Sequence, residues 1–192
     1  MIISRAPLRI SFFGGVTDSP SFTKKEYGCA ISTSINKYVY STVQNSFSRK
    51  NIVVYLKREN EDNIENIKHD RAKEIMKKTG LTKGMEIHCL SDVPARTGLG
   101  SSSSFAVSLF NGLYKHQGKR VSKTKLAEDA ALIEINVLKE PIGKQDQYAA
   151  AFGGLNFIKF NTDGSVEIKP IKISKETLKN KIENNLLLFY LN

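Results

Sequence analysis

The chain has 192 residues, 40% of them hydrophobic and 25% charged, and carries a formal net charge of +10. This length can bury one good hydrophobic core, and the composition is that of a soluble globular protein. No stretch approaches the roughly 18 apolar residues of a membrane span, and the N-terminal stretch around Arg5 and Arg9 lacks the long apolar run of a signal peptide. The sequence therefore predicts a cytoplasmic protein and argues against membrane proteins.

The positive charge alone would suit nucleic acid, a membrane surface or an anionic metabolite as partner. Its lysines are spread through the chain, however, and often fall on predicted solvated faces. The two cysteines, Cys29 and Cys89, lie in apolar strand-like runs without metal-ligand spacing. We interpret them as buried thiols of a reducing compartment.

The first part of the chain is rich in strand patterns. Residues 2–15 alternate apolar and polar side chains and are interrupted by Pro7, which predicts two short strands or one strand with a kink. Alternating β-rich runs follow at 29–44 and 51–57, separated by a turn. The polar stretch 58–70 predicts no element.

Helical patterns dominate the middle of the chain. A short helix over 71–80 is stopped by its last residue, Gly80, and a strand over 85–94 ends at a proline. Two helices are predicted next, over residues 101–116 and 123–138, the second capped by Ser122.

The last part predicts a hairpin, a helix and a strand. Residues 154–160 and 166–173 flank the turn sequence NTDGS. A small helix over 174–185 precedes an apolar run over 186–191, which indicates a closing strand buried on both faces. The predicted fold class is α+β, with two layers in which helices pack on a mostly antiparallel sheet.

The most unusual stretch is DVPARTGLGSSSSFAVSLF, residues 92–110, where glycines and four serines precede a helical pattern. Ser101 or Ser102 could simply be a helix N-cap. Gly98 and Gly100 also allow sharp turns and close approach of the backbone to a ligand. Free N–H groups and the helix dipole would then form an anion site, with phosphate as the natural ligand.

Three ordered motifs narrow the interpretation: RAPLRISFFGGVTD (5–18), DVPARTGLGSSSSFAVS (92–108) and EINVLKEPIGKQDQYAAAFGGLNFIKF (134–160). Together they resemble the amino-terminal half of the GHMP kinases, most closely the D-glycero-D-manno-heptose 7-phosphate kinases and then fucokinase-type sugar kinases. The resemblance covers nearly the whole chain. It implies that residues 1–192 form the ATP-binding domain, with the ribosomal-protein-like fold of that family, and that the carboxyl-terminal domain is absent from this chain.

The resemblance assigns nucleotide and metal sites. The family's ATP-phosphate loop corresponds to eight residues here: Pro94, Gly98, Leu99, Gly100, Ser101, Ser102, Ser103 and Ser104. Ser102 and Glu134 match the family's Mg²⁺ ligands; the nearby Glu128 fits the spacing to Asp146 less well. A hydroxyl and a carboxylate are suitable hard oxygen ligands for Mg²⁺. The expected cofactors are ATP and Mg²⁺.

The catalytic and acceptor residues follow in the same way. Asp146 matches the family's catalytic aspartate, and Arg9 matches the basic residue that lies near it. A carboxylate can orient an acceptor hydroxyl and take its proton during phosphoryl transfer. Asp18, with Thr17, Gly15 and Gln145, is assigned to the sugar acceptor. The likeness to the subfamily implies phosphorylation at C1 of heptose 7-phosphate, for precursors of lipopolysaccharide or capsule.

One departure from the family leaves alternatives open. No glycine-rich loop follows Gly164, so the second wall of the family's ATP cleft is missing and the chain is expected to be a weak or inactive kinase. The acceptor could be another sugar, such as fucose or galactose. The other alternative is a non-catalytic module of the same fold that binds sugar or RNA. Tyr38, Tyr40 and Phe47 lie near basic residues, which would suit RNA. The positive charge is diffuse, however, which argues against nucleic acid as the partner. Arg96 and Lys144, close to the motifs, would suit a phosphorylated acceptor.

Overall fold

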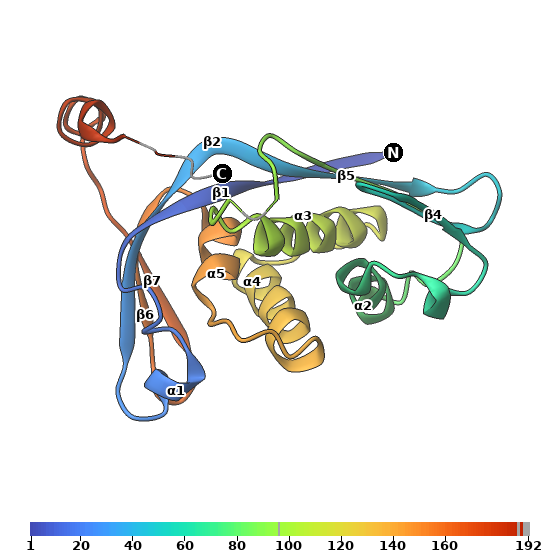
Figure 1. Ribbon diagram of the computed structural model, residues 1–192, viewed down its shortest axis with the longest axis horizontal. Coiled ribbons are helices and arrows are strands. Elements are labelled where there is room, and N and C mark those ends of the chain that lie inside the picture. The colour runs from blue at the N-terminus through green and yellow to red at the C-terminus, as the bar shows by residue number, and fades with distance from the viewer. Residues whose placement is uncertain (96, 188, 190–192) are drawn as a thin grey trace.

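A computed structural model describes residues 1–95, 97–187 and 189, which form a curved sheet with its longer helices on one side (Figure 1). The sheet has seven strands in the order β4-β3-β5-β2-β6-β7, with β1 paired to β2 beside this path. Among the described strands, β3 and β5 are parallel and every other pair is antiparallel. The strands are β1 (Ile2–Phe13), β2 (Gly28–Asn45), β3 (Asn51–Val54), β4 (Arg58–Glu61), β5 (Met85–Ser91), β6 (Leu155–Phe160) and β7 (Val166–Pro170).

Strand β2 is long enough to serve two parts of the sheet. Its first part pairs with β6 and its last part with β5, while β1 runs beside both. The 2–15 pattern is one strand with a kink, because the register of β1 shifts between Pro7 and Arg9 and again between Ser11 and Phe13. The sheet bends along these two strands, and its β6–β7 end turns down beside the helices (Figure 1).

Four helices lie together on the concave face of the sheet (Figure 1), which confirms the two-layer α+β prediction. They are α2 (Asp70–Thr79), α3 (Ser101–His116), α4 (Lys123–Ala131) and α5 (Gln145–Phe152). A π-helical turn, η2 (Leu132–Val137), extends α4, so the predicted 123–138 helix is present with a widened end. The shorter segments are α1 (Pro20–Thr23), η1 (Ile64–Asn66), α6 (Lys175–Thr177), η3 (Leu178–Ile182) and η4 (Glu183–Asn185).

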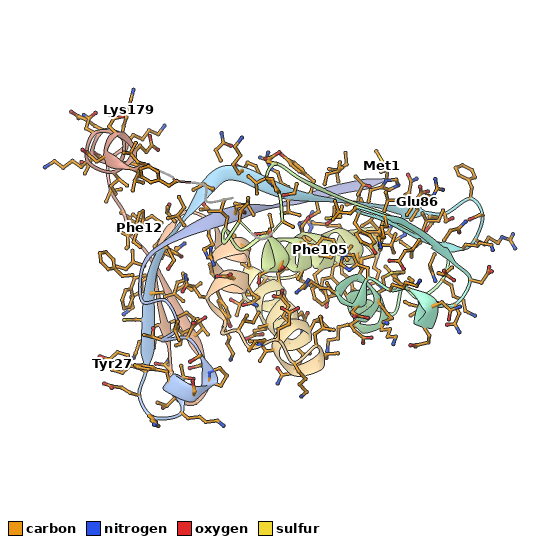
Figure 2. All side chains as sticks on the ribbon, viewed as in Figure 1. Met1, Phe12, Tyr27, Glu86, Phe105 and Lys179 are labelled. Atoms are coloured by element: carbon orange, nitrogen blue, oxygen red, sulfur yellow. The ribbon has the colours of Figure 1, made fainter. Side chains whose placement is uncertain are left out.

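Helix α3 is the centre of the core. Leu109, Phe110 and Leu113 are completely buried, and Phe105 lies below the sheet near its first turn (Figure 2). Fully burying an aliphatic or aromatic side chain of this size contributes roughly 1.5–3 kcal/mol. Ser108 donates to the carbonyl oxygen of Ser4 (3.1 Å), so α3 is also fastened to β1 by a hydrogen bond. The N-terminus of α3 is therefore held at a fixed place against β1.

Local signals in the sequence place most helix ends correctly. Gly80 ends α2 in a left-handed conformation, and the Ser122 hydroxyl accepts from the Lys125 N–H at the start of α4. The 58–70 stretch is a correction, because it contains strand β4 and η1. The 186–191 strand is also wrong for the residues that are described: Leu186, Leu187 and Phe189 form no strand, and the last two are 82% and 79% exposed. Residues 188 and 190–192 lie outside the described part.

Within the described residues, no helix combines the length and the apolar character that crossing a lipid bilayer requires.

Candidate active site

Residues 94–104, here called the serine loop, lead into α3, and no side chain caps the start of this helix. The N-cap is Gly100, in the left-handed conformation at φ 76°, and Gly98 before it has φ 73°. Of the two alternatives for this stretch, the serine N-cap is therefore not observed, because Ser101 and Ser102 both lie within the first turn. The first N–H groups of a 16-residue helix keep no side-chain partner, which leaves donors for an anion where the helix dipole is positive.

The four serines divide between the cleft and the interior. The Ser103 and Ser104 side chains are buried, and the Ser104 hydroxyl donates to the carbonyl oxygen of Pro7 (2.8 Å) on β1. Ser101 is half-buried and Ser102 is exposed. Only the first two hydroxyls are thus available to a ligand, whereas the other two position the helix.

The first and third motifs meet the serine loop through an ion pair. Arg9 donates from Nε and Nη2 to the two carboxylate oxygens of Asp146, both at 2.8 Å, and from Nη1 to the carbonyl oxygen of Gly98 at 2.6 Å. Its backbone N–H donates to the carbonyl of Leu99 (3.1 Å). Bidentate Arg–carboxylate pairs fix geometry as well as adding energy. Arg9 therefore ties Asp146, at the start of α5, to the loop before α3.

Gly100 packs directly on this ion pair. A Cβ placed on Gly100 would lie 3.3 Å from the Arg9 Cγ and 3.4 Å from the Asp146 Oδ2. Because the uncapped helix start and the catalytic-type carboxylate lie in contact, one ligand can reach both. Asp146 keeps 29% of its side chain exposed, so its carboxylate is accessible.

Asp18 contacts the first residue of α5, the helix that carries Asp146. Its Oδ2 accepts from the Gln145 N–H (2.9 Å), and a Cβ on Gly143 would lie 2.1 Å from that oxygen, so only glycine fits there. Burial raises the pKa of Asp18, and the negative charge of Asp146 adds to the rise, whereas the Gln145 N–H lowers it. Asp18 thus accepts a hydrogen bond from the start of α5 and lies close enough to Asp146 and Arg9 to be influenced by their charges.

A cavity of about 280 Å³ joins these groups. Its walls include Arg9, Asp146, Asp18, Gln145 and Gly15. The structure thereby brings together both predicted catalytic residues and three of the four predicted acceptor residues.

Thr17, the fourth acceptor residue, is engaged elsewhere: its hydroxyl donates to the carbonyls of Gly14 (2.7 Å) and Cys29 (2.9 Å). It fixes the turn between β1 and α1. Pro94 is exposed at the start of the loop, and its carbonyl accepts from Thr97. Arg96 lies outside the described residues, and Lys144 donates to the carbonyl of Gly164.

Glu134 is the centre of a buried polar cluster. Its side chain is fully buried; Arg71 Nε donates to Oε1 (3.0 Å), and the Ser103 hydroxyl (2.8 Å) and Gln147 Nε2 (2.6 Å) donate to Oε2. Arg71 also pairs with Glu140. Burial raises the pKa of Glu134, against the lowering effect of the Arg71 guanidinium. The cluster joins α2, α3, η2 and α5, and so fastens both walls of the cleft.

The proposed metal ligands fit Mg²⁺ unequally. Ser102 offers an exposed hydroxyl, but Ser103, not Ser102, hydrogen-bonds to Glu134 in the described part of the chain. Both carboxylate oxygens of Glu134 already accept hydrogen bonds, one of them from a guanidinium that would repel a cation. As it lies here, Glu134 does not fit a metal ligand. The described residues also hold no group of three or more His, Cys, Asp or Glu side chains arranged for a metal.

Sequence patterns gave no signal for Arg71 or for Gly143. An arginine in the first turn of an amphipathic helix has the same pattern whether it is solvated or paired in the interior. In the sequence, Gly143 has the pattern of an ordinary turn residue. Only the position of Asp18 in the structure shows that a side chain at this position would not fit.

Comparisons with known proteins indicate a family and a fold. Residues 66–154 match the family described as GHMP kinases N terminal domain. The chain is 28% identical, over its whole length, to a D-glycero-alpha-D-manno-heptose 7-phosphate kinase of Campylobacter jejuni, of which it spans 60%. It superposes with a TM-score of 0.86 on a Bacteroides thetaiotaomicron structure titled D-glycero-D-manno-heptose 1-phosphate kinase, at 26% identity, covering 93% of this chain and 62% of that one.

A galactokinase of Lactococcus lactis, solved with galactose, shares the fold at 20% identity, with a TM-score of 0.67 and coverage of 90% of this chain and 48% of that one. The three motifs meet in one cleft, the sheet and helices follow this fold, and the matched range includes the serine loop and Asp146. Residues 66–154 thus match the N-terminal domain of the GHMP kinases, and the described chain has the fold of that domain.

Proposed function

We propose that this domain binds ATP and transfers its γ-phosphoryl group to a sugar hydroxyl, with C1 of D-glycero-D-manno-heptose 7-phosphate as the best-supported acceptor. The observation that carries the proposal is the contact of Gly100 with the Arg9–Asp146 pair, which joins a helix N-terminus to an accessible carboxylate. The likeness to a heptose 7-phosphate kinase supports the acceptor.

The start of α3 is the proposed phosphate site. The backbone N–H groups of its first turn, together with the turn at Gly98 and Gly100, would donate to the phosphate oxygens. Arg9 lies beside this turn and would offset charge on the transferring group. Leu99 and the serines shape the loop, since Ser103 and Ser104 are anchored in the interior.

Asp146 is the proposed base. The acceptor oxygen would attack the γ-phosphorus while the bond to the β-phosphate oxygen breaks, releasing ADP, and the acceptor proton would pass to the Asp146 carboxylate. Such a base typically contributes a factor of about 10²–10⁴ in rate. Arg9 holds both carboxylate oxygens, so the carboxylate orientation is fixed before the acceptor binds.

Magnesium would enter as part of the substrate, MgATP, and supplies charge neutralisation on the phosphates. Ser102 is the residue whose exposed hydroxyl could contact it. We propose for Glu134 the fastening role given by its contacts to Arg71, Ser103 and Gln147.

The acceptor would lie in the cavity beside Asp146. Asp18 and Gln145 line it with polar groups, and Gly15 leaves open space where a side chain would otherwise project. Thr17 would act indirectly, by fixing the turn that carries Gly15. The chain spans only about 60% of its curated relative, so we propose that full turnover needs a further part of the protein to close the cleft and exclude water.

Two measurements test the function separately. Calorimetric titration with MgATP should show binding to the 192-residue chain, and absence of binding would refute the nucleotide site. Transfer of labelled phosphate from ATP to heptose 7-phosphate should be slow with this chain alone. Ordinary turnover by the chain alone would refute the need for a further part, and specific transfer to fucose or galactose instead would refute the acceptor.

A further inference from the structure

A second cavity, of about 440 Å³, lies next to the proposed acceptor site. The two cavities share Gly15, Val16 and Ser19 as walls, so they meet at the turn between β1 and α1. Asp146 lines only the smaller cavity, and Lys25 lines only the larger one. A single extended ligand that crosses this turn could therefore occupy both.

The turn between the cavities is strained and closely packed. Val16 has φ 73°, a conformation that β-branched residues rarely adopt, and its side chain is 78% exposed. Glycines allow the turn to pack closely: a Cβ on Gly14 would lie 1.8 Å from the Cys29 carbonyl oxygen, and one on Gly28 would lie 1.9 Å from that of Thr17. Such strain persists only where surrounding contacts impose it, and it concentrates at ligand sites.

Gly15 lines both cavities. It has an ordinary φ and no atom within 4 Å of the place where a Cβ would lie, so neither the backbone nor packing requires glycine here. The missing side chain keeps the wall low at the point where the cavities meet. The wall that the two cavities share therefore carries no side chain at position 15, and the space around that position is open.

The larger cavity carries groups suited to an anion. The Lys25 ammonium is its cation, and the hydroxyls of Ser19 and Ser21, which lie 2.9 Å apart, can donate. Glu26 also lines this cavity, so an anion would have to lie on the Lys25 and serine side. Lys25, Ser21 and Glu26 are exposed, so no charge has to be stripped of water before the ligand arrives.

We infer that the larger cavity binds the acceptor's own phosphate, so that a phosphorylated sugar lies with its reacting hydroxyl at Asp146 and its phosphate at Lys25. The inference rests on the proposed function and adds to it the subsite that selects a sugar phosphate over a neutral sugar. Lys25 and the hydroxyls of Ser19 and Ser21 bind the phosphate, and Gly15 leaves the shared wall open.

The test compares two neighbouring lysines in the whole 192-residue chain. Lys25→Ala removes the cation of the cavity, and Lys24→Ala removes the same charge one residue earlier, from a side chain that does not line either cavity. Calorimetry in the presence of a non-hydrolysable ATP analogue measures binding of D-glycero-D-manno-heptose 7-phosphate and of the same heptose without phosphate. Gly15→Asp and Gly15→Ala provide a second pair that tests the shared wall.

The unmodified chain and Lys24→Ala should prefer the heptose phosphate by about tenfold. Lys25→Ala should reduce that preference to about threefold or less, without changing the affinity for the neutral heptose or for the ATP analogue. Gly15→Asp should abolish the preference, and Gly15→Ala should keep most of it. Equal preference in Lys25→Ala and Lys24→Ala would overturn the inference. Failure of the unmodified chain to bind the ATP analogue would instead overturn the proposed function.

Discussion

Replacing Gly100 by alanine probes the junction of the serine loop with the Arg9–Asp146 pair. The substitution has two costs. A residue with a Cβ in the left-handed conformation costs roughly 1–2 kcal/mol, and Gly100 has φ 76°. In addition, the new methyl group would lie 3.3–3.4 Å from Arg9 and Asp146 atoms, so these side chains have to shift by a few tenths of an ångström.

Gly80→Ala is the matched control. Gly80 ends α2 at φ 77°, and nothing lies within 4 Å of the place where its Cβ would be. Both variants pay the same backbone cost, which lowers Tm by about 2–8 °C in a chain of this size. Only Gly100→Ala also displaces the ion pair and the first-turn N–H groups.

Calorimetry with MgATP separates the two effects. We expect Gly100→Ala to bind at least about tenfold more weakly, a loss of roughly 1.4 kcal/mol, and Gly80→Ala to bind like the unmodified chain. Equal affinities in the two variants would refute the reasoning, because the contact with Arg9 and Asp146 would then have no influence on the phosphate site.

Three further predictions follow from the site and its supports. Asp146→Asn should slow phosphate transfer at least about 100-fold while MgATP affinity stays equal or rises, since a negative charge beside the phosphates is removed; weakened MgATP binding would contradict this. Arg71→Met should cost about 3–5 kcal/mol in urea unfolding because Glu134 is left buried and unpaired, and adding Glu134→Gln should recover much of it; no recovery would contradict the pairing. The His69 Nδ1 accepts from the Ala72 N–H, and burial lowers the pKa of His69 from 6.5. The unfolded chain therefore takes up the proton first, and stability should fall as pH drops below 6.5. The His69→Asn variant keeps a side chain that can cap the helix but does not titrate, so between pH 7.5 and 5.5 it should lose less stability than the unmodified chain. An equal loss in both proteins would refute His69 as the cause of the pH dependence.

Local patterns predicted those parts of the fold that are stabilised locally. The end of α2 at Gly80, the cap at Ser122 and the β6–β7 hairpin all depend on residues close in sequence. Strand β4 was not predicted because it is a polar edge strand that buries no alternating apolar face, and β3 is its one partner among the described strands. The 186–191 run is apolar without forming a strand in its described residues, because apolarity alone does not supply a pairing partner.

The sequence predicted site residues that lie in the three motifs, but it did not predict contacts between residues far apart in the chain. The motifs predicted that Arg9 lies near Asp146, and in the structure the two side chains form an ion pair. The predicted helix over 101–116 has the bounds of α3, but the sequence did not show which serines of its first turn face the interior. In the structure Ser103 donates to Glu134, and Ser102 is exposed. Arg71 lies 63 residues before Glu134, and no local pattern distinguishes a buried glutamate from a solvated one on such a helix.

Amide nuclear magnetic resonance during a titration with MgATP tests most directly whether the start of α3 and Asp146 form one nucleotide site. We predict that the backbone N–H signals of residues 98 and 100–103 move together with that of Asp146, at a single affinity. Saturable MgATP binding that leaves these signals in place and moves those of another surface would contradict the account.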